Sequence, residues 1–173
     1  RWIGLTFIAC FTNVLFGQSN WYNQQWNEGK VELELKKLIN PKKVLYIAAH
    51  PDDENTRLIA YFENVLHVDV AYLSLTNGSG GQNLISEELG NDLGLIREQE
   101  LYAARRHDGG EQFFTSATDF GYSKTHTETF KKWNKEKILG EVVYRIRAYQ
   151  PDIIITRFAP YTEGLNRTHG HHT

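Results

Sequence analysis

An apolar run at residues 44–49 ends directly at a cluster of acidic and histidine side chains, and this junction constrains the fold more than any other feature. The run reads VLYIAA and is followed at once by HPDDE at residues 50–54. Short continuous apolar runs bounded by turn residues are typical of strands buried on both faces of a parallel sheet. In such sheets, ligands bind beyond the carboxyl ends of the strands. The junction therefore predicts a buried strand that carries polar side chains into a site.

Strand-like and helix-like segments alternate along the rest of the chain. Three segments have apolar side chains at helical spacing, at residues 58–66, 95–103 and 139–146. Two further apolar runs predict strands at residues 68–75 and 152–158, the latter also buried, and a weaker, short strand is predicted at residues 112–115. Pro151 ends the last helical segment and separates it from the last strand. This alternation predicts an α/β fold: a Rossmann-like, mostly parallel sheet with helices on both faces.

The charge and the cysteine content of the chain limit what it binds. Nineteen Lys and Arg residues against 21 Asp and Glu residues give a formal charge of −2, which provides no bulk attraction for nucleic acid or an anionic membrane. We therefore expect a small-molecule partner, while the oligomeric state stays open. Cys10 is the single cysteine, which excludes an internal disulfide and a zinc site built on several cysteines. A metal ion would be held by histidine and carboxylate side chains.

The two ends of the sequence look like parts of a longer, exported protein. Residues 2–16 form an uncharged, mostly apolar run behind Arg1, which is the order of a secretory signal peptide over residues 1–18. The run is shorter than the roughly 20 residues that span a membrane, so we expect no stable span in the mature chain. Two alternatives are a lipid anchor at Cys10 and a buried N-terminal helix. The absence of Met and the terminal His cluster predict a fragment, with a lead-in segment at 19–40 and a domain from 41 to 173 that is truncated at its C-terminus.

The acidic cluster at residues 52–54 would be costly to hold beside a buried strand without a positive charge. A divalent cation would solve this problem, because His50 and Asp53 can converge on one ion across the turn while Asp52 points elsewhere and stays free. Catalytic zinc takes three protein ligands, and the His cluster at residues 169–172 can supply the third. The alternative is that the acidic residues only cap the following helix.

The string AAHPDDE at residues 48–54, with a hydrophobic strand before it and a His-x-x-His pair far downstream, closely resembles the PIG-L/LmbE-like family. These are zinc-dependent deacetylases that remove acetyl from N-acetylglucosamine conjugates. The resemblance runs from about residue 44 to residue 173. LTNGSGGQN at residues 75–83 and IREQEL at residues 96–101 are similar to further parts of the family pattern, with lower specificity.

The resemblance implies roles for the matching residues. His50, Asp53 and His172 would be zinc ligands, Asp52 would be the general base that acts on zinc-bound water, and His169 would steady the oxyanion as an imidazolium. The family commonly has His-Pro-Asp-His where this chain has His-Gly-His-His, so the neighbouring His171 competes with His172 as the third ligand.

Two more residues would contact the sugar or its attached group. Arg97 matches the family's Arg-x-x-Glu-Leu helix, although a pair with Glu100 at helical spacing is the alternative. Asp119 matches an Asp-x-Gly substrate loop, although it could simply start a turn. The metal is expected to be zinc, but sites with two imidazoles and one carboxylate also accept iron or cobalt.

These inferences predict an exported, zinc-dependent N-deacetylase acting on an amino-sugar conjugate that the sequence does not identify. We expect a bacterial protein in the periplasm or outside the cell, because the glycosylation acceptor patterns at Asn77 and Asn166 lie in predicted active-site loops. The main alternative is a non-catalytic carbohydrate-binding or scaffold domain on the same fold. A dinucleotide-dependent oxidoreductase is disfavoured, because HPDD follows the first strand where a Gly-x-Gly-x-x-Gly turn would be required.

Overall fold

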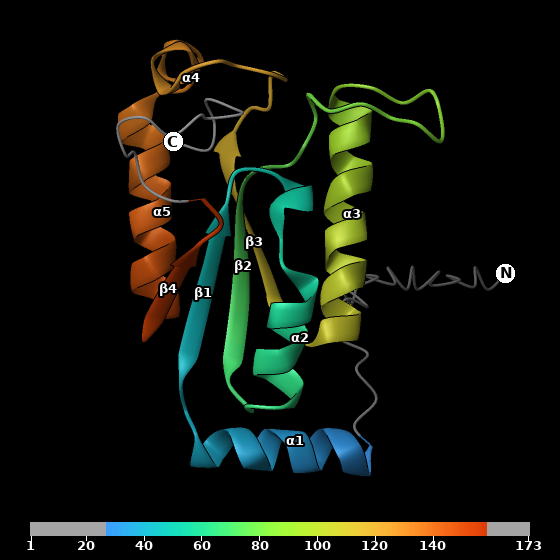
Figure 1. The fold of residues 1–173 in the computed structure, drawn as a ribbon, viewed down its shortest axis with the longest axis vertical. Coiled ribbons are helices and arrows are strands. Elements are labelled where there is room, and N and C mark those ends of the chain that lie inside the picture. The colour runs from blue at the N-terminus through green and yellow to red at the C-terminus, as the bar shows by residue number, and fades with distance from the viewer. Residues whose placement is uncertain (1–26, 159–173) are drawn as a thin grey trace, which may run out of the picture.

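Four parallel strands form a sheet in residues 27–158, the part of the chain that the computed structural model describes (Figure 1). They are β1 (Lys43–Ala48), β2 (Asp69–Thr76), β3 (Glu111–Ala117) and β4 (Ile153–Thr156), in the spatial order β3-β2-β1-β4. Every pairing between neighbouring strands is parallel. The predicted parallel α/β sheet is confirmed.

Helices cover both faces of this sheet, as the alternation of segments predicted. The α-helices are α1 (Glu28–Ile39), α2 (Thr56–Asn64), α3 (Asn91–Asp108), α4 (His126–Lys132) and α5 (Lys135–Tyr149). Helices α2 and α3 lie on one face and α5 lies on the other, while α1 runs across the amino-terminal edge of the strands (Figure 1). Helix α1 falls within the predicted lead-in segment. Among the described residues, no helix is both long enough and apolar enough to cross a membrane.

Side chains that alternate along the strands build one core on each face of the sheet, and a third, smaller cluster lies around Ala117, Trp133 and Ile138. The core between the sheet and helices α2 and α3 includes Val44, Tyr46, Ile59, Tyr72 and Leu101. The core between the sheet and α5 includes Leu45, Ala71, Leu73 and Tyr149. Strands β1 and β2 are therefore buried on both faces, because each has neighbours on both sides and helices above and below. This confirms the interpretation of the apolar run at residues 44–49.

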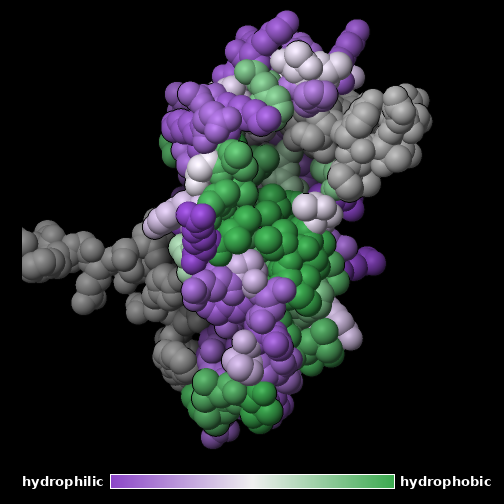
Figure 2. Space-filling view, turned by 90° about the vertical axis from the view of Figure 1, so that its left-hand side faces the viewer, coloured by the Kyte–Doolittle hydropathy of each residue, from purple (hydrophilic) through white to green (hydrophobic). Residues whose placement is uncertain are grey.

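Two predictions of burial were wrong. The last strand was expected to be buried, but Ile153 is 52% exposed and Ile154 is 45% exposed, because β4 is the edge strand of the described sheet. Figure 2 views this side of the molecule and shows apolar side chains gathered there. In α3, Leu95 and Ile96 were expected to face the core but are exposed. The buried face instead includes Leu93, Leu101, Arg105 and Asp108.

The strand order places the end of β1 at a topological switch point. From β1 the chain adds β2 and then β3 on one side, and it returns through α5 to place β4 on the other side of β1. Adjacent parallel strands whose connections run in opposite directions leave a crevice at their carboxyl ends, and this is where open α/β sheets bind ligands. His50 lies just after β1 at this edge.

Candidate metal centre

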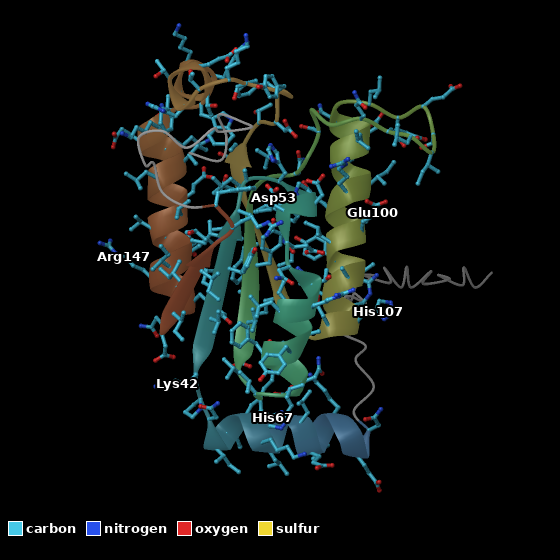
Figure 3. The ribbon with its side chains drawn as sticks, viewed as in Figure 1. Lys42, Asp53, His67, Glu100, His107 and Arg147 are labelled. Atoms are coloured by element: carbon cyan, nitrogen blue, oxygen red, sulfur yellow. The ribbon has the colours of Figure 1, made fainter. Side chains whose placement is uncertain are left out.

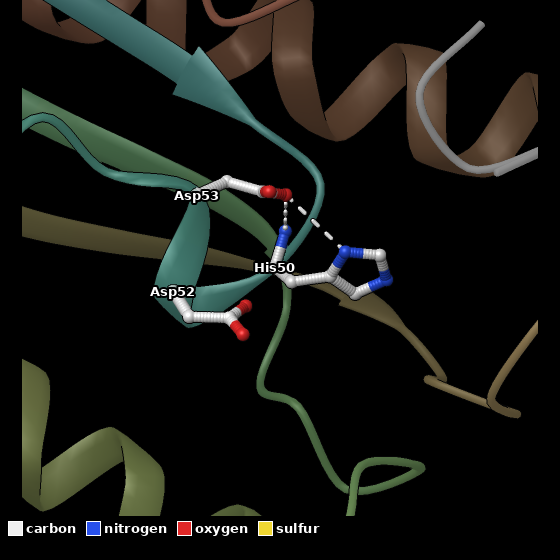
Figure 4. Close-up of side chains that lie close together, drawn as sticks. All are labelled: His50, Asp52 and Asp53. Carbon is white, nitrogen blue, oxygen red and sulfur yellow. Dashed lines mark hydrogen bonds and ion pairs between the residues drawn. The ribbon is translucent and has the colours of Figure 1, made fainter. Parts of the chain in front are cut away.

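The side chains of His50 and Asp53 are tied to each other by a short turn that follows β1. A 3₁₀ turn, η2 (Pro51–Asp53), begins with proline, whose fixed φ suits the first position of a helical turn. The backbone N–H of His50 donates to Asp53 Oδ2 at 2.9 Å, and His50 Nδ1 lies 3.2 Å from the same oxygen (Figure 4). Figure 3 shows Asp53 at the opposite end of the sheet from Lys42 and His67.

Three of the predicted site residues lie close enough together to share one metal ion. His50, Asp52 and Asp53 each offer a ligand atom, and these atoms lie within 4.8 Å of one another. The His50 and Asp53 side chains are largely buried, whereas Asp52 is exposed. An imidazole nitrogen with carboxylate oxygens is a donor set that suits zinc and related divalent cations. The turn therefore fits the metal that the sequence implied, with Asp52 beside the ligands rather than directed away from them.

The remaining predicted metal and oxyanion residues belong to the histidine cluster at residues 169–172. His169, His171 and His172 lie outside the described residues, as does the predicted signal peptide at residues 1–18. Their roles stay predictions.

The third acidic residue of the cluster, Glu54, is paired with a buried arginine that the sequence analysis missed. Arg105 of α3 is only 4% exposed, and its Nη1 lies 2.6 Å from Glu54 Oε2. Its other side forms a fork with Asp108, through Nε at 3.1 Å and Nη2 at 2.6 Å. Burial raises the pKa of the Glu54 carboxyl, and the Arg105 guanidinium opposes this shift. Arg105 therefore supplies part of the positive charge that the acidic cluster at residues 52–54 requires.

The alternative in which residues 52–54 cap the next helix holds for the 3₁₀ turn itself, where Asp53 accepts the backbone N–H of His50 in a capping box, but not for α2. The N-cap of α2 is Asn55, whose side-chain oxygen accepts a hydrogen bond from the backbone N–H of Leu58 at 3.1 Å. Asp53 bonds back to His50, and Glu54 bonds to Arg105. Asp52 and Asp53 thus remain as the negative charges of the turn that face the candidate ion.

Arg97 lies against the turn through the glycine-rich loop that follows β2. Its Nη2 donates to the carbonyl oxygen of Gln82 at 3.4 Å. A Cβ added to Gly78 would lie 2.7 Å from Arg97 Cδ and 3.1 Å from Pro51 Cγ, so both side chains pack on this glycine. Within residues 27–158 there is no ion pair between Arg97 and Glu100. Arg97 therefore lies beside the candidate centre, where it was predicted to contact substrate.

Asp119 forms a turn that packs on the same glycine-rich loop. Its Oδ1 accepts the backbone N–H of Gly121 at 2.9 Å, and the residue is 7% exposed. A Cβ added to Gly80 would lie 2.4 Å from the Gly121 nitrogen and 2.6 Å from Asp119 Oδ1, so this position has no room for a side chain. The turn-forming role given as the alternative is thus present in the structure. A contact between Asp119 and substrate stays a prediction.

Comparisons with known proteins match most of the chain. A family model described as "PIG-L: GlcNAc-PI de-N-acetylase" matches residues 45–173. A comparison with curated protein sequences gave no match.

Two solved structures are similar to this chain in fold, and the two are enzymes that catalyse different reactions. One is the 4-carboxy-2-hydroxymuconate hydratase GalB from Pseudomonas putida KT2440, with a TM-score of 0.54 and 17% identity, covering 76% of this chain and 52% of that one. The other is the N,N'-diacetylchitobiose deacetylase from Pyrococcus horikoshii, with a TM-score of 0.53 and 21% identity, covering 87% of this chain and 57% of that one. The chain thus spans just over half the length of these structures. The likeness supports the fold alone.

Proposed function

The chain belongs to the PIG-L family of GlcNAc-PI de-N-acetylases, and on that premise we propose that it is a metal-dependent hydrolase that removes the acetyl group from an N-acetylglucosamine-type conjugate. The observation that carries the proposal is the convergence of His50, Asp52 and Asp53 within 4.8 Å at the carboxyl end of β1. This group lies inside the segment that matches the family and at the switch point of the sheet.

Zinc is the proposed metal, held by His50, Asp53 and His172. His171 is the competing third ligand, and iron and cobalt are the competing metals. The direction of β4 supports a third ligand from residues 169–172. Strand β4 pairs in parallel with β1, so the chain leaves both strands at the same edge of the sheet. A bound ion supplies Lewis acidity, which acidifies water and polarises an acyl oxygen.

The chain's own residues would then move the protons and orient the substrate. The exposed carboxylate of Asp52 takes a proton from the water that attacks the acetamide carbon. His169, as an imidazolium, donates a hydrogen bond to the oxyanion that forms. When the C–N bond breaks, Asp52 or His169 returns a proton to the leaving nitrogen, so the products are acetate and a free amino sugar. Arg97 and Asp119 are the proposed contacts to the sugar or its attached group.

An acetate-release assay tests this function. The complete protein, loaded with zinc, is incubated with a panel of N-acetylglucosamine derivatives, and acetate and free amine are measured together with bound metal. We expect acetate and amine to appear in equal amounts and activity to be lost when the metal is chelated. Sugar binding without acetate release, with metal supplied, would instead support the non-catalytic carbohydrate-binding alternative. Addition of water to an unsaturated carboxylic acid would support a hydratase.

Export through the signal peptide at residues 1–18, into a bacterial periplasm or the medium, is part of the proposal. One structural observation supports a bacterial rather than a eukaryotic secretory origin. The Asn77 Nδ2 that would carry a glycan donates to Glu98 Oε1 at 2.9 Å, and a Cβ on Gly94 would lie 2.7 Å from it. Attachment of a sugar would break this packing. A glycan found on Asn77 of the native protein would contradict the expectation.

A further inference from the structure

Two buried side chains hold the HPDDE turn from its inner side, and neither belongs to the predicted metal site. Tyr72 of β2 has no exposed surface, and its hydroxyl donates a hydrogen bond to the carbonyl oxygen of His50. Arg105 of α3 holds the other end of the turn through Glu54. The Arg105 guanidinium lies 5.8 Å from the centre of the Tyr72 ring, so the two side chains also contact each other.

The hydrogen bonds on His50 fix the orientation of its peptide group. Its carbonyl oxygen accepts from the Tyr72 hydroxyl and also from the backbone N–H of Asp53, at 3.2 Å. Two donors on one carbonyl leave that peptide plane little freedom to rotate. A fixed plane restrains the backbone on both sides of it, at His50 and at Pro51, and with it the direction in which the Cβ of His50 leaves the chain.

The fork between Arg105 and Asp108 makes the other end of the turn equally firm. Asp108 takes two of the guanidinium nitrogens, at 3.1 and 2.6 Å, which leaves Nη1 directed at Glu54. Nη1 also lies 3.4 Å from Gln112 Oε1 of β3. A planar guanidinium held at three points is a fixed anchor, which a flexible ammonium group would not be.

We propose that Tyr72 and Arg105 form a buried brace that sets the direction of the His50 and Asp53 side chains, and that they are positioning residues for the metal centre. The catalytic consequence rests on the proposed function. The effect on the turn itself does not, because it follows from contacts within the metal-free chain. Outer partners that orient metal ligands typically contribute about 10- to 100-fold to metal affinity or activity.

Tyr72→Phe tests the brace, because it removes one oxygen atom and keeps the ring in the core. We expect faster amide hydrogen exchange at residues 50–54 in the metal-free protein, zinc affinity weakened by about 10-fold, and a lower kcat with KM unchanged. Tyr149→Phe is the matched control. Tyr149 is also buried, but its hydroxyl has no hydrogen-bond partner among the described residues. Tyr149→Phe should therefore leave the amide exchange at residues 50–54, the zinc affinity and kcat at the parental values.

Arg105→Lys provides a second test that keeps the positive charge but removes the planar fork. We expect the same faster exchange at residues 50–54 and the same weakening of zinc binding, with the KM of the substrate unchanged. Parental exchange and parental zinc affinity in both variants would overturn the brace. If the two variants show faster exchange and weaker zinc binding than the parent, but the parent itself releases no acetate, only the proposed function is overturned. The two failures can therefore be told apart.

Discussion

Asp53→Ala is expected to lose the metal, whereas Asp52→Asn is expected to keep the metal and lose nearly all turnover. Asp53 is largely buried and bonded to both the backbone and the ring of His50, so its removal takes away a ligand and loosens the other. Asp52 is exposed beside them, and the amide of asparagine cannot accept a proton from water. Loss of a general base typically lowers kcat by about 10²- to 10⁴-fold.

Metal content and kcat measured side by side check this pair of variants. Asp92→Asn is a matched control, because Asp92 is an exposed carboxylate in the first turn of α3 and has no proposed role. It should leave the metal content and kcat unchanged. Activity equal to the parent in both Asp52→Asn and Asp53→Ala would refute the assignment of these two residues.

Arg105→Met is expected to lower the free energy of unfolding by about 3–5 kcal/mol, because it leaves Glu54 and Asp108 buried without their positive partner. Arg105 is almost fully buried, so water does not screen these pairs as it would on the surface. The methionine side chain can fill much of the space but provides no hydrogen-bond donor. Denaturant unfolding of the metal-free protein measures the effect.

Arg106→Met is the control for this loss of stability. Arg106 is the next residue in the same helix, is exposed, and forms no ion pair within the described residues. Its replacement should change the free energy of unfolding by less than about 0.5 kcal/mol, as surface substitutions usually do. Equal effects of the two variants would contradict a structural role for the buried pairs.

The central strands could be predicted from the sequence because strands that are buried on both faces appear in it as continuous apolar runs. Residues 44–49 and 68–75 are apolar on both faces, and the structure buries both faces. Helix α4 was missed, because its sequence HTETFKK has a single apolar residue and no stripe. It is held instead by a Thr125 cap and by a buried hydroxyl pair between Ser123 and Thr129, at 2.9 Å. Such contacts leave no periodic pattern.

The part of the candidate site in the turn after β1 could also be predicted, because its residues are neighbours in the sequence. His50, Asp52 and Asp53 lie within four residues, so one local turn brings them together and the spacing alone indicates a common ion. Tyr72 and Arg105 come from distant parts of the chain, and their approach depends on how β2 and α3 pack around β1. Buried arginine is rare enough that the sequence analysis gave Arg105 no role. Because the Arg105 partner was not foreseen, the negative charge of Glu54 was expected to be balanced by the metal ion.

The central claim is that one metal ion joins the turn after β1 to the histidines at residues 169–172. A crystal structure of the zinc-loaded complete protein, with anomalous data at the zinc edge, tests it directly. We predict one ion bound by His50 and Asp53, with an imidazole nitrogen of His172 at about 2.0–2.1 Å. An ion bound by the turn without any imidazole from residues 169–172, or an ion bound elsewhere, would contradict the claim.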